Sequence, residues 1–413
     1  MRILIVTQYF WPEDFRINDL AVGLRERGHE VIVYTGKPNY PQGRFFQGYG
    51  FFRGANDSYR DIRIIRVPLI PRGDAGAYRL GLNYASFALF ATALAPFRVP
   101  GRFDAILVYE PSPVTVGLPA VLLKKLKAAP LLFWVQDLWP ESLSATGAVR
   151  EAWILKAVEH LVRFLYRRCD LILVQSRAFI EPVRAFGISA DRIAYFPNSA
   201  EAFYRPVTVE TEATERAKLP DGFRVMFAGN IGVAQDFETI IAAAERLKPF
   251  PDIRWIIVGD GRMLSWVEAE VARRSLQASV FLLGRYPPAS MPRWFALADV
   301  MLVTLREDPI FAMTIPAKAQ SYFACARPIV AALDGEGARV IREAGAGITV
   351  APGNAAALAE AVMALYRMPE PERHAMGERG RRYFEQHFER ERLLGQLEKW
   401  MDECAGAGGP CAS

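Results

Sequence analysis

Residues 313–350, MTIPAKAQSYFACARPIVAALDGEGARVIREAGAGITV, decide how the second half of this chain folds. The pattern predicts an amphipathic helix, an Arg-Pro turn, a buried strand, a Gly-rich loop and another helix. Thr314 is expected to cap the first of these helices, with Ile315 and Pro316 in its first turn. The free N–H groups and positive dipole of this helix start suit a diphosphate, and Lys318 adds a positive charge one turn inside.

The same alternation of strand-like and helical segments runs through the whole chain. Apolar runs such as 3–7, 105–109 and 131–136 in the first half, and 225–228 and 254–258 in the second, are separated by amphipathic segments. This alternation predicts right-handed βαβ units and two doubly wound parallel sheets. At 413 residues the chain is too long for one ordinary core, so two Rossmann-like domains are expected.

Two long stretches interrupt the alternation. The polar stretch 200–222 is interpreted as the linker between the domains. The stretch 37–60, KPNYPQGRFFQGYGFFRGANDSYR, is rich in Gly, Pro and aromatic residues. Long loops in compact domains are usually functional or disordered. This one suits either a sugar-stacking or lipid-facing role, or a loop folded back on its own domain.

The basic residues are concentrated in the first half of the chain. Residues 1–205 carry 26 Lys and Arg against 18 Asp and Glu, whereas the rest carries 24 against 27. The first half also holds an apolar helix around 84–97, flanked by Arg79, Arg98 and Arg102. This stretch is shorter than the roughly 20 apolar residues that a bilayer span needs. Two interpretations stay open: docking on an anionic membrane surface, or a buried helix beside a solvated basic face.

The cysteines and the N-terminus favour a cytoplasmic protein. The 4 cysteines form no Cys-x-x-Cys pair and have no histidine partner at metal spacing, so we expect reduced thiols and no metal site. Only a short apolar run precedes the polar Thr7, which is too little for a signal peptide.

The loop after the strand at 225–228 is a candidate phosphate-binding or sugar-binding loop, because ligands of open α/β sheets bind beyond the carboxyl ends of strands. Gly229 and Gly232 allow the backbone to approach a ligand closely, and Asn230 and Gln235 supply neutral donors. A glycine turn between a strand and a helix is common, so this loop alone is weak evidence.

The motifs, taken in their order and spacing, closely resemble the family-4 glycosyltransferases. That family has the GT-B architecture, two Rossmann-like domains facing each other across a cleft. The resemblance covers nearly the whole chain, and the segments together look like the WbuB group, bacterial sugar transferases of capsule and O-antigen assembly. The matching segments are QYFWPEDFRINDLAVGLRERGHEV from residue 8, KPNYPQG from 37, WVQDLWPES from 134, FAGNIG from 227, VGDGRM from 258, LGRYP from 283 and IPAKAQSY from 315.

The resemblance implies a domain division. It places an acceptor-binding domain at 1–204 and a donor-binding domain at 205–384. A terminal helix at 385–404 would return to the first domain.

On the donor side, the resemblance implies that Gly259 and Gly261, with Arg262, lie below the nucleotide, and that Arg285 reads the nucleobase. The alternative for this Gly-x-Gly segment is an ordinary tight turn with Arg262 on the surface. The Arg and Lys that usually hold the donor diphosphate in the family are absent from the Gly229 loop.

The family's Glu-x7-Glu pattern is also absent, since its two positions hold Met313 and Ser321. Ser321 is expected to make a weaker hydrogen bond to ribose, and Glu307 and Asp308 to supply the missing sugar contact. Glu336, after the next strand, either faces the donor or interacts with the dipole of its own helix.

On the acceptor side, acids follow two strands of the first half. Glu110 and Asp137 are the candidate catalytic acids, together with Lys318 on the donor side, because a nearby carboxylate can take the proton of an acceptor hydroxyl. Their alternative role is capping of the following helices. The residues assigned to acceptor binding are Glu13, Phe15, Arg16 and Glu141.

The resemblance implies a retaining, metal-independent transfer of a sugar from a nucleotide diphosphate, with no further cofactor. The expected donor is a UDP-activated deoxy sugar such as N-acetyl-L-fucosamine. The expected acceptor is a polyprenyl-diphosphate-linked saccharide at the cytoplasmic face of the inner membrane, where the protein would bind peripherally. No nucleic acid is expected as a partner.

Two other classes of protein stay open. A sugar-nucleotide 2-epimerase shares the architecture but needs acid and base groups in its cleft, and the chain has only 4 histidines. Turnover of a nucleotide sugar without acceptor would identify it. A non-catalytic membrane assembly protein is the second, because the Glu pair is absent; it would bind nucleotide sugar without turnover. A dehydrogenase is disfavoured, because no Gly-x-Gly-x-x-Gly opens the first helix.

Overall fold

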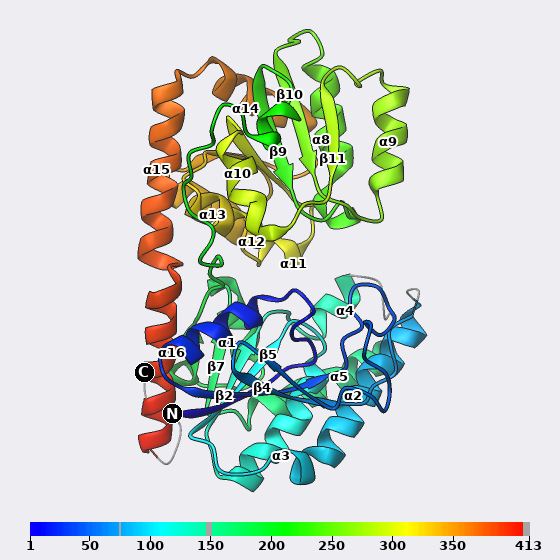
Figure 1. Ribbon diagram of the computed structural model, residues 1–413, viewed down its shortest axis with the longest axis vertical. Helices are drawn as coiled ribbons and strands as arrows, with labels where there is room; N and C mark the ends of the chain where they lie inside the picture. The colour runs from blue at the N-terminus through cyan, green and yellow to red at the C-terminus, as the bar shows by residue number, and fades with distance from the viewer. Residues whose placement is uncertain (74–75, 146–150, 408–413) are drawn as a thin grey trace. The chain divides into compact units, whose positions relative to one another are not determined.

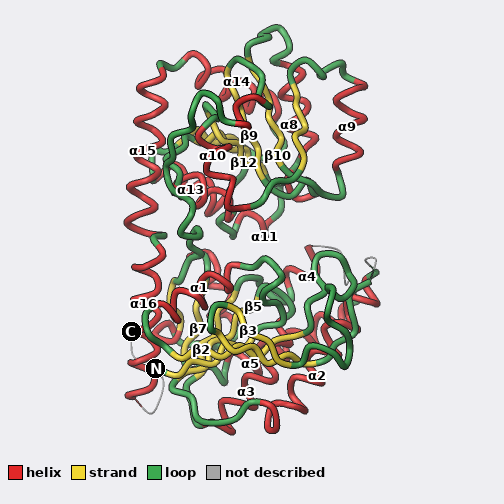
Figure 2. Tube along the Cα trace, viewed as in Figure 1, coloured by secondary structure: helices red, strands yellow, loops and turns green. Residues whose placement is uncertain are grey.

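The computed structural model describes residues 1–73, 76–145 and 151–407 and divides the chain into two compact units (Figure 1). Unit 1 comprises Met1–Pro197 with Glu391–Ser413, and unit 2 comprises Asn198–Arg390. Each unit holds one mainly parallel sheet with helices around it (Figure 2). The prediction of two doubly wound α/β domains is therefore confirmed.

Unit 1 is built on an eight-stranded sheet with the order β3-β4-β2-β1-β5-β6-β7-β8. All neighbours pair in parallel except β3 with β4. The strand order reverses between β1 and β5, so their carboxyl ends flank a natural ligand position. The strands are β1 Arg2–Val6, β2 Glu30–Gly36, β3 Asn56–Tyr59, β4 Ile62–Val67, β5 Ala105–Glu110, β6 Leu131–Val135, β7 Leu171–Val174 and β8 Ile193–Tyr195.

The helices of unit 1 form two layers. Right-handed crossovers place α1 on one face of the sheet and α2, α3, α5 and α6 on the other, because these two sets connect strands in opposite directions along the sheet (Figure 1). Helix α16 joins α1 in one apolar core cluster. The helices are α1 Arg16–Glu26, α2 Ala77–Arg98, α3 Gly117–Lys127, α4 Glu141–Ala145, α5 Ala152–Tyr166, α6 Ile180–Ala185 and α16 Arg390–Ala407.

Unit 2 has a six-stranded parallel sheet with the order β11-β10-β9-β12-β13-β14. Its order reverses between β9 and β12. Two apolar core clusters fill the two sides of this sheet. The strands are β9 Phe223–Ala228, β10 Ile253–Val258, β11 Val280–Gly284, β12 Val300–Thr304, β13 Ile329–Ala332 and β14 Gly347–Val350. The helices are α7 Thr214–Ala217, α8 Phe237–Arg246, α9 Leu264–Arg273, α10 Met291–Ala296, α11 Pro309–Ala312, α12 Ala317–Ala324, α13 Gly335–Glu343, α14 Ala355–Arg367 and α15 Glu370–His387.

The polar stretch 200–222 is part of unit 2 rather than a free linker. The ring of Tyr204 stacks on Phe295 with 5.9 Å between centroids. Glu215 forms an ion pair with Arg293 at 2.8 Å. These contacts were not predictable from composition, because a polar segment that packs on a surface looks like one that does not.

The end of the chain forms two helices, not the single helix expected. Helix α15 ends at His387, and Phe388 is completely buried in a core cluster of unit 2. Helix α16 then packs on unit 1 through side chains that include Leu394, Leu397 and Met401. The helix breaks because the apolar side chains of α15 are buried in the core of unit 2, whereas those of α16 are buried in the core of unit 1.

Helix α2 is longer than the predicted stretch. By length and composition alone, Tyr78–Arg98 is long and apolar enough to cross a membrane, and it is the one such helix among the described residues. The expectation that it is too short is therefore wrong. This is weak evidence for a span, because one side of α2 packs against β2, β4 and α3.

The cysteines differ from expectation at one position. Cys169 and Cys325 are free and buried. Cys404 is disulfide-bonded, so the prediction of reduced thiols fails there. Cys411 lies outside the described residues.

Candidate functional site

The donor-side residues gather at the carboxyl edge of the unit 2 sheet, where the strand order reverses. The loop that begins at Gly229 follows β9, and the segment leading into α12 follows β12, the neighbouring strand. Ligands of open α/β sheets bind at this kind of position. The fold therefore brings together the two segments that the sequence assigned to a phosphate-bearing ligand.

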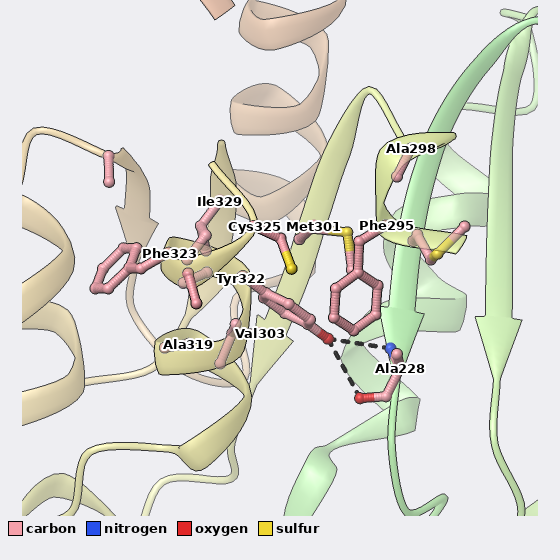
Figure 3. Close-up of a cluster of buried hydrophobic side chains, with 14 of the residues drawn as sticks. Ala228, Phe295, Ala298, Met301, Val303, Ala319, Tyr322, Phe323, Cys325 and Ile329 are labelled. Carbon is pink, nitrogen blue, oxygen red and sulfur yellow. Dashed lines mark hydrogen bonds between the residues drawn. The ribbon is translucent and has the colours of Figure 1, made fainter. Parts of the chain in front are cut away.

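A buried tyrosine fastens these two segments to each other (Figure 3). The Tyr322 hydroxyl of α12 accepts a hydrogen bond from the Ala228 N–H at 3.1 Å and donates one to the Ala228 carbonyl at 3.2 Å. Phe295 packs edge-on against the Tyr322 ring at 5.1 Å. Burial raises the pKa of Tyr322 above its usual value, so the hydroxyl stays protonated. We call the pair of hydrogen bonds between Tyr322 and Ala228 the clamp. It fixes the end of β9, and hence the Gly229 loop, against α12.

Lys318 lies one turn earlier on α12, and its ammonium faces the same loop. The nitrogen is 3.7 Å from the centroid of the Phe227 ring and 3.3 Å from the position of a Cβ added to Gly229. The Nζ atom is buried and has no hydrogen-bond partner among the described residues. Burial lowers the pKa of Lys318 to about 7. A desolvated cation without a counter-ion at a helix start is suited to an anionic ligand.

The glycines of the Gly-x-Gly turn are required by loop packing. A Cβ on Gly259 would lie 1.9 Å from the Gly229 carbonyl oxygen, and one on Gly261 would lie 2.3 Å from that of Ile231. The Gly259 N–H also donates to the Gly284 carbonyl at 2.8 Å. These contacts join the loops after β9, β10 and β11 into one layer, and they explain the two glycines without a bound donor.

Some side chains of this layer are hydrogen-bonded within their own loop, and others are exposed to solvent. The Gln235 Oε1 accepts hydrogen bonds from the Gly232 N–H at 3.2 Å and the Asn230 Nδ2 at 3.4 Å, so Gln235 orders its own loop. Arg262 and Arg285 have exposed side chains. The exposed arginines remain available to a ligand, whereas the acceptor atom of Gln235 is already used.

The start of α12 differs from the prediction. The helix begins at Ala317 with Pro316 at the N-cap position and without a side-chain cap. The Thr314 hydroxyl donates to the Phe311 carbonyl at 2.9 Å, so Thr314 closes the turn after α11 rather than capping α12. Ile315 is buried in the core cluster. The correction arises because the short α11 precedes α12 and takes up the threonine.

Ser321 and Glu336 are both engaged inside unit 2. Ser321 is 5% exposed, and its hydroxyl donates to the Ala317 carbonyl at 3.4 Å within the helix. Glu336 accepts two hydrogen bonds from Arg339, each at 2.9 Å. The observed geometry gives Glu336 the local role at a helix start that was the alternative to donor contact.

Glu307 and Asp308, the expected substitutes for the missing carboxylates, line a cavity of about 220 Å³ in unit 2. Arg306 and Asp334 line the same cavity. The Asp308 carboxylate accepts a hydrogen bond from the Ile310 N–H at 2.8 Å and caps α11. Apolar side chains such as Leu305, Phe311 and Leu333 also line the cavity, which lies beside the carboxyl ends of β12 and β13.

In unit 1 a polar network occupies the carboxyl edge of the sheet. The Gln8 amide donates to Asn83 at 2.7 Å, and Asn83 donates to Asn39 at 3.4 Å and to the Ile70 carbonyl at 2.6 Å. All three side chains are buried or nearly so. They tie the loops after β1, β2 and β4 to α2, which forms one wall of the network.

Glu110 is the last residue of β5, and Asp137 lies two residues beyond the end of the neighbouring β6. Glu110 is completely buried, and its burial, with the Asp137 charge second, raises its pKa well above the usual value. Burial raises the pKa of Asp137 to about 6, while a hydrogen bond from Ser112 lowers it in part. The raised pKa favours the protonated form of Glu110, and its complete burial keeps the carboxyl from contacting a substrate in this conformation. Asp137 is the better placed proton acceptor of the two.

The residues assigned to acceptor binding have different surroundings. Glu13 is 1% exposed and accepts hydrogen bonds from the N–H groups of Asn39 at 2.8 Å and Tyr40 at 2.7 Å. Burial raises the pKa of Glu13 to about 7, and these N–H groups lower it in part. Its visible role is to hold two loops together. Glu141 is exposed and begins α4, and Arg16 is partly buried at the start of α1.

Phe15 belongs to an aromatic group that the sequence did not reveal as a unit. Its ring stacks on Tyr9 at 5.0 Å and lies 5.4 Å from Tyr40. The Arg72 guanidinium lies over Tyr40 at 5.0 Å and over Tyr9 at 5.9 Å. These residues come from three loops, and no local pattern predicts that they meet. Stacked rings beside a guanidinium can contact a sugar face and an anion together.

The two doubly wound units, one of which carries a cation at a glycine loop on its switch point, define a two-domain Rossmann-like α/β architecture. Residues 15–199 match the Glycosyl transferase 4-like domain, and residues 222–368 match Glycosyl transferases group 1. The chain therefore belongs to the family-4 glycosyltransferases, and it is an enzyme of the hexosyltransferase type.

Two curated relatives agree with this assignment. The chain is 26% identical to the putative colanic acid biosynthesis glycosyl transferase WcaI of Escherichia coli over 338 residues, which cover 78% of this chain and 81% of that protein. It is 29% identical to the probable glycosyltransferase WbjE of Pseudomonas aeruginosa over 234 residues, covering 55% of this chain and 58% of that protein.

Solved structures share the fold. HepE of Anabaena in complex with UDP superposes with a TM-score of 0.69 at 15% identity and covers 97% of this chain and 100% of its own. WaaG, a glycosyltransferase of lipopolysaccharide biosynthesis, superposes with a TM-score of 0.65 at 16% identity, covering 98% and 100%. The expected GT-B fold class is confirmed for the two parallel-sheet domains.

Proposed function

We propose that this glycosyltransferase moves a sugar from a UDP-activated donor held by unit 2 to a lipid-linked saccharide held by unit 1. The sugar proposed is N-acetyl-L-fucosamine or a related deoxy sugar, and the acceptor is a polyprenyl-diphosphate-linked saccharide. The process is cell-surface polysaccharide synthesis at the cytoplasmic face of the inner membrane. The similarity to WcaI, a putative glycosyl transferase of colanic acid biosynthesis, supports the process, and the UDP complex of HepE supports the nucleotide.

The observation that carries the proposal is the uncompensated ammonium of Lys318. It lies at the start of α12 and faces Gly229, where the side chain of any other residue would approach it. The loop lacks the family's usual cations, because Asn230 and Gln235 stand there. Lys318 supplies positive charge to the same loop from the neighbouring helix. A diphosphate would give this ammonium the counter-ion that the described residues do not provide.

The proposed reaction is retaining and needs no divalent metal. As the glycosidic bond breaks, negative charge grows on the leaving diphosphate, and the Lys318 ammonium with the N–H groups at the start of α12 stabilises it. The acceptor hydroxyl attacks from the face that the diphosphate leaves. Its proton passes to the departing phosphate or to Asp137, whose pKa of about 6 leaves it ionised at neutral pH. The completely buried Glu110 interacts with Asp137 through its charge and does not touch the substrate.

Calorimetric titration with UDP and with GDP tests the donor site first. Micromolar binding of UDP that weakens about ten-fold in Lys318→Ala, or roughly 1.4 kcal/mol, supports the proposal. Preferential binding of GDP would change the donor to a guanosine sugar. Binding of neither nucleotide by folded protein would overturn the donor site.

Turnover assays separate the transferase from the two other classes. Transfer from UDP-N-acetyl-L-fucosamine to a polyprenyl-diphosphate-linked saccharide, undiminished by EDTA, is the expected result. Interconversion of the nucleotide sugar without acceptor would indicate an epimerase. Nucleotide-sugar binding without turnover on any lipid-linked acceptor would indicate an assembly protein.

A further inference from the structure

Helix α2 exposes an apolar face that no described part of the chain covers. Between Arg79 and Arg98 the helix has no charged residue. Positions four residues apart, at 81, 85, 89, 93 and 97, are all exposed and are all Gly, Ala, Leu or Phe. Leu89 is 65% exposed and Phe97 is 83% exposed. A helix that is apolar on every side is normally buried on every side, so this face needs a partner.

The opposite side of α2 anchors the helix to unit 1. Phe87, Ala91 and Ala95 are completely buried. Asn83 is hydrogen-bonded to Gln8 and to the Ile70 carbonyl in the polar network described above. Leaving the sheet would break this packing and strand buried polar groups. The helix is therefore held flat on the protein and does not span a bilayer in this fold.

Exposed large apolar side chains continue over the neighbouring helices of the same layer. Helix α3 packs against α2 and α5 against α3, on the side of the sheet away from α1 (Figure 1). Leu126 of α3 is 49% exposed, and Trp153 of α5 is 72% exposed. Among the described residues of unit 2, only Val233 and Phe250 are of this kind. Most of the exposed large apolar side chains among the described residues thus belong to this layer of unit 1.

The loop that begins at Lys37 adds to this layer. Phe51 meets Phe90 of α2 edge-on with 5.5 Å between centroids, and the adjacent Phe52 is 89% exposed. The loop therefore folds back on its own domain, which was one of the two interpretations, and at the same time presents an aromatic ring to the outside. Both features are compatible with a lipid-facing loop.

The charges of the layer are predominantly positive. Helices α2, α3 and α5 together carry 7 basic residues and 1 acidic residue, Glu159, which pairs with Arg163. A second copy of this chain would set basic helices against basic helices, which disfavours a symmetric dimer through this surface. An anionic bilayer matches this layer, because its apolar interior can take up the exposed apolar side chains and its negative head groups can pair with the basic residues.

We infer that the outer surface of α2, α3 and α5, with Phe52 beside it, docks on an anionic lipid bilayer with α2 lying in the plane of the interface. The inference rests on the proposed function in placing the acceptor in a bilayer. It adds which surface binds and how α2 is oriented. Asn83, on the anchored side of α2, belongs to the polar network of unit 1, so docking would leave α2 between that network and the head groups, where a lipid-linked saccharide begins.

Vesicle flotation of the full chain, without donor or acceptor, tests the inference. We compare phosphatidylcholine vesicles with vesicles that also contain phosphatidylglycerol, at low and high salt. The wild type is expected to bind only the anionic vesicles and to lose binding at high salt. Leu89→Glu combined with Phe97→Glu is expected to reduce binding roughly ten-fold or more. Phe250→Glu, an exposed position of unit 2, is the matched control and is expected to bind as the wild type does.

Several results would overturn the inference. They are absence of wild-type binding to anionic vesicles, equal binding by the Leu89→Glu/Phe97→Glu variant, or a wild-type dimer in sedimentation velocity that this variant dissolves. UDP titration of the same variants is the separate readout of the donor site. Retained UDP affinity without vesicle binding would sink the docking surface alone, whereas vesicle binding without UDP affinity would sink the proposed function alone.

Discussion

The ammonium of Lys318 lies 3.7 Å from the centroid of the Phe227 ring, with no carboxylate bonded to it among the described residues. The ring face is a weak substitute for a counter-ion, because a cation–π contact recovers only part of the hydration that a buried charge loses. The site therefore holds a charge that is costly when empty and useful when an anion is present. Two predictions follow from this single pair.

The first concerns nucleotide affinity and pH. Because burial lowers the pKa of Lys318 to about 7, the ammonium loses its proton as the pH rises through that value. UDP affinity should therefore fall between about pH 7 and 9, and the fall should be absent in Lys318→Met. Isothermal titration at several pH values measures it. Lys248→Met, at an exposed lysine of unit 2, serves as the control and should keep the wild-type profile.

The second prediction concerns stability: a mutation at this binding-site residue is expected to stabilise the protein. The ordinary pKa of 10.5 lies above the folded value of about 7, so between these values the unfolded chain holds the proton and the folded chain does not. Wild-type stability should then rise with pH across that window. Below about pH 7 the folded protein carries the full cost of the buried charge.

Lys318→Met should remove this cost and raise the free energy of unfolding at pH 6 by about 1–4 kcal/mol. Urea denaturation at pH 6 and pH 9 measures the effect, which should shrink at the higher pH. A variant that loses UDP binding while gaining stability cannot be explained by misfolding. A destabilised Lys318→Met would contradict the uncompensated charge.

The two acids of unit 1 should separate in their effects on transfer. Asp137→Asn should lower kcat by about 10²–10⁴-fold with UDP affinity unchanged, since it removes the proposed proton acceptor. Glu110→Gln, which mimics the protonated acid, should cost less than about ten-fold. In the wild type, kcat/KM should fall as the pH drops below about 6, where Asp137 becomes protonated. Equal losses in both variants would mean that the two carboxyls act as one unit.

Tyr322→Phe tests the clamp on the end of β9. The change removes the hydroxyl that satisfies both backbone groups of Ala228 and should cost about 1–3 kcal/mol of stability. Chemical denaturation measures this cost. Tyr366→Phe, at a half-buried ring that packs on Phe223, should stay within about 0.5 kcal/mol of the wild type. A neutral Tyr322→Phe would show that the strand end holds its position without the clamp.

Two glycine substitutions should act with opposite sign. Gly259 has a φ of +151° and no room for a Cβ, so Gly259→Ala should destabilise unit 2 by more than about 2 kcal/mol. Gly81 lies within α2 with open space around it, so Gly81→Ala should stabilise unit 1 by about 0.5–1 kcal/mol. Thermal unfolding of both variants gives the comparison, and a tolerated Gly259→Ala would contradict the close packing of the two loops.

Much of the fold was predictable because the signals are local. Strands of βαβ units are buried on both faces, so each appears in the sequence as an apolar run. The loops at their carboxyl ends, where ligands bind, can then be located as the segments that follow these runs. Lys318 was identifiable for the same reason, since a cation after a helix start is visible within a few residues. The Gly229 loop was found in the same way.

What was not predictable depends on contacts between distant segments. The Tyr322 hydroxyl meets Ala228, 94 residues away. The local sequence does not show whether a carboxylate that follows a strand is buried. Glu110 is completely buried, whereas Glu141 is exposed. Pro316 takes the N-cap position expected of Thr314 because a helix of one turn, α11, precedes α12 and its end occupies Thr314. Helix boundaries shift by a few residues when tertiary contacts favour it.

The return of α16 to unit 1 has a consequence for how the protein is made. Unit 2 is one continuous stretch of chain, whereas unit 1 is completed only by residues after 390. Leu394, Leu397 and Met401 belong to the same core cluster as Ile3 and Ile5 of the first strand. During synthesis the first unit must therefore wait, with part of its apolar surface open, until the whole second unit and the last helix have left the ribosome. A ribosome that stops early on this message releases a chain whose older half cannot finish folding.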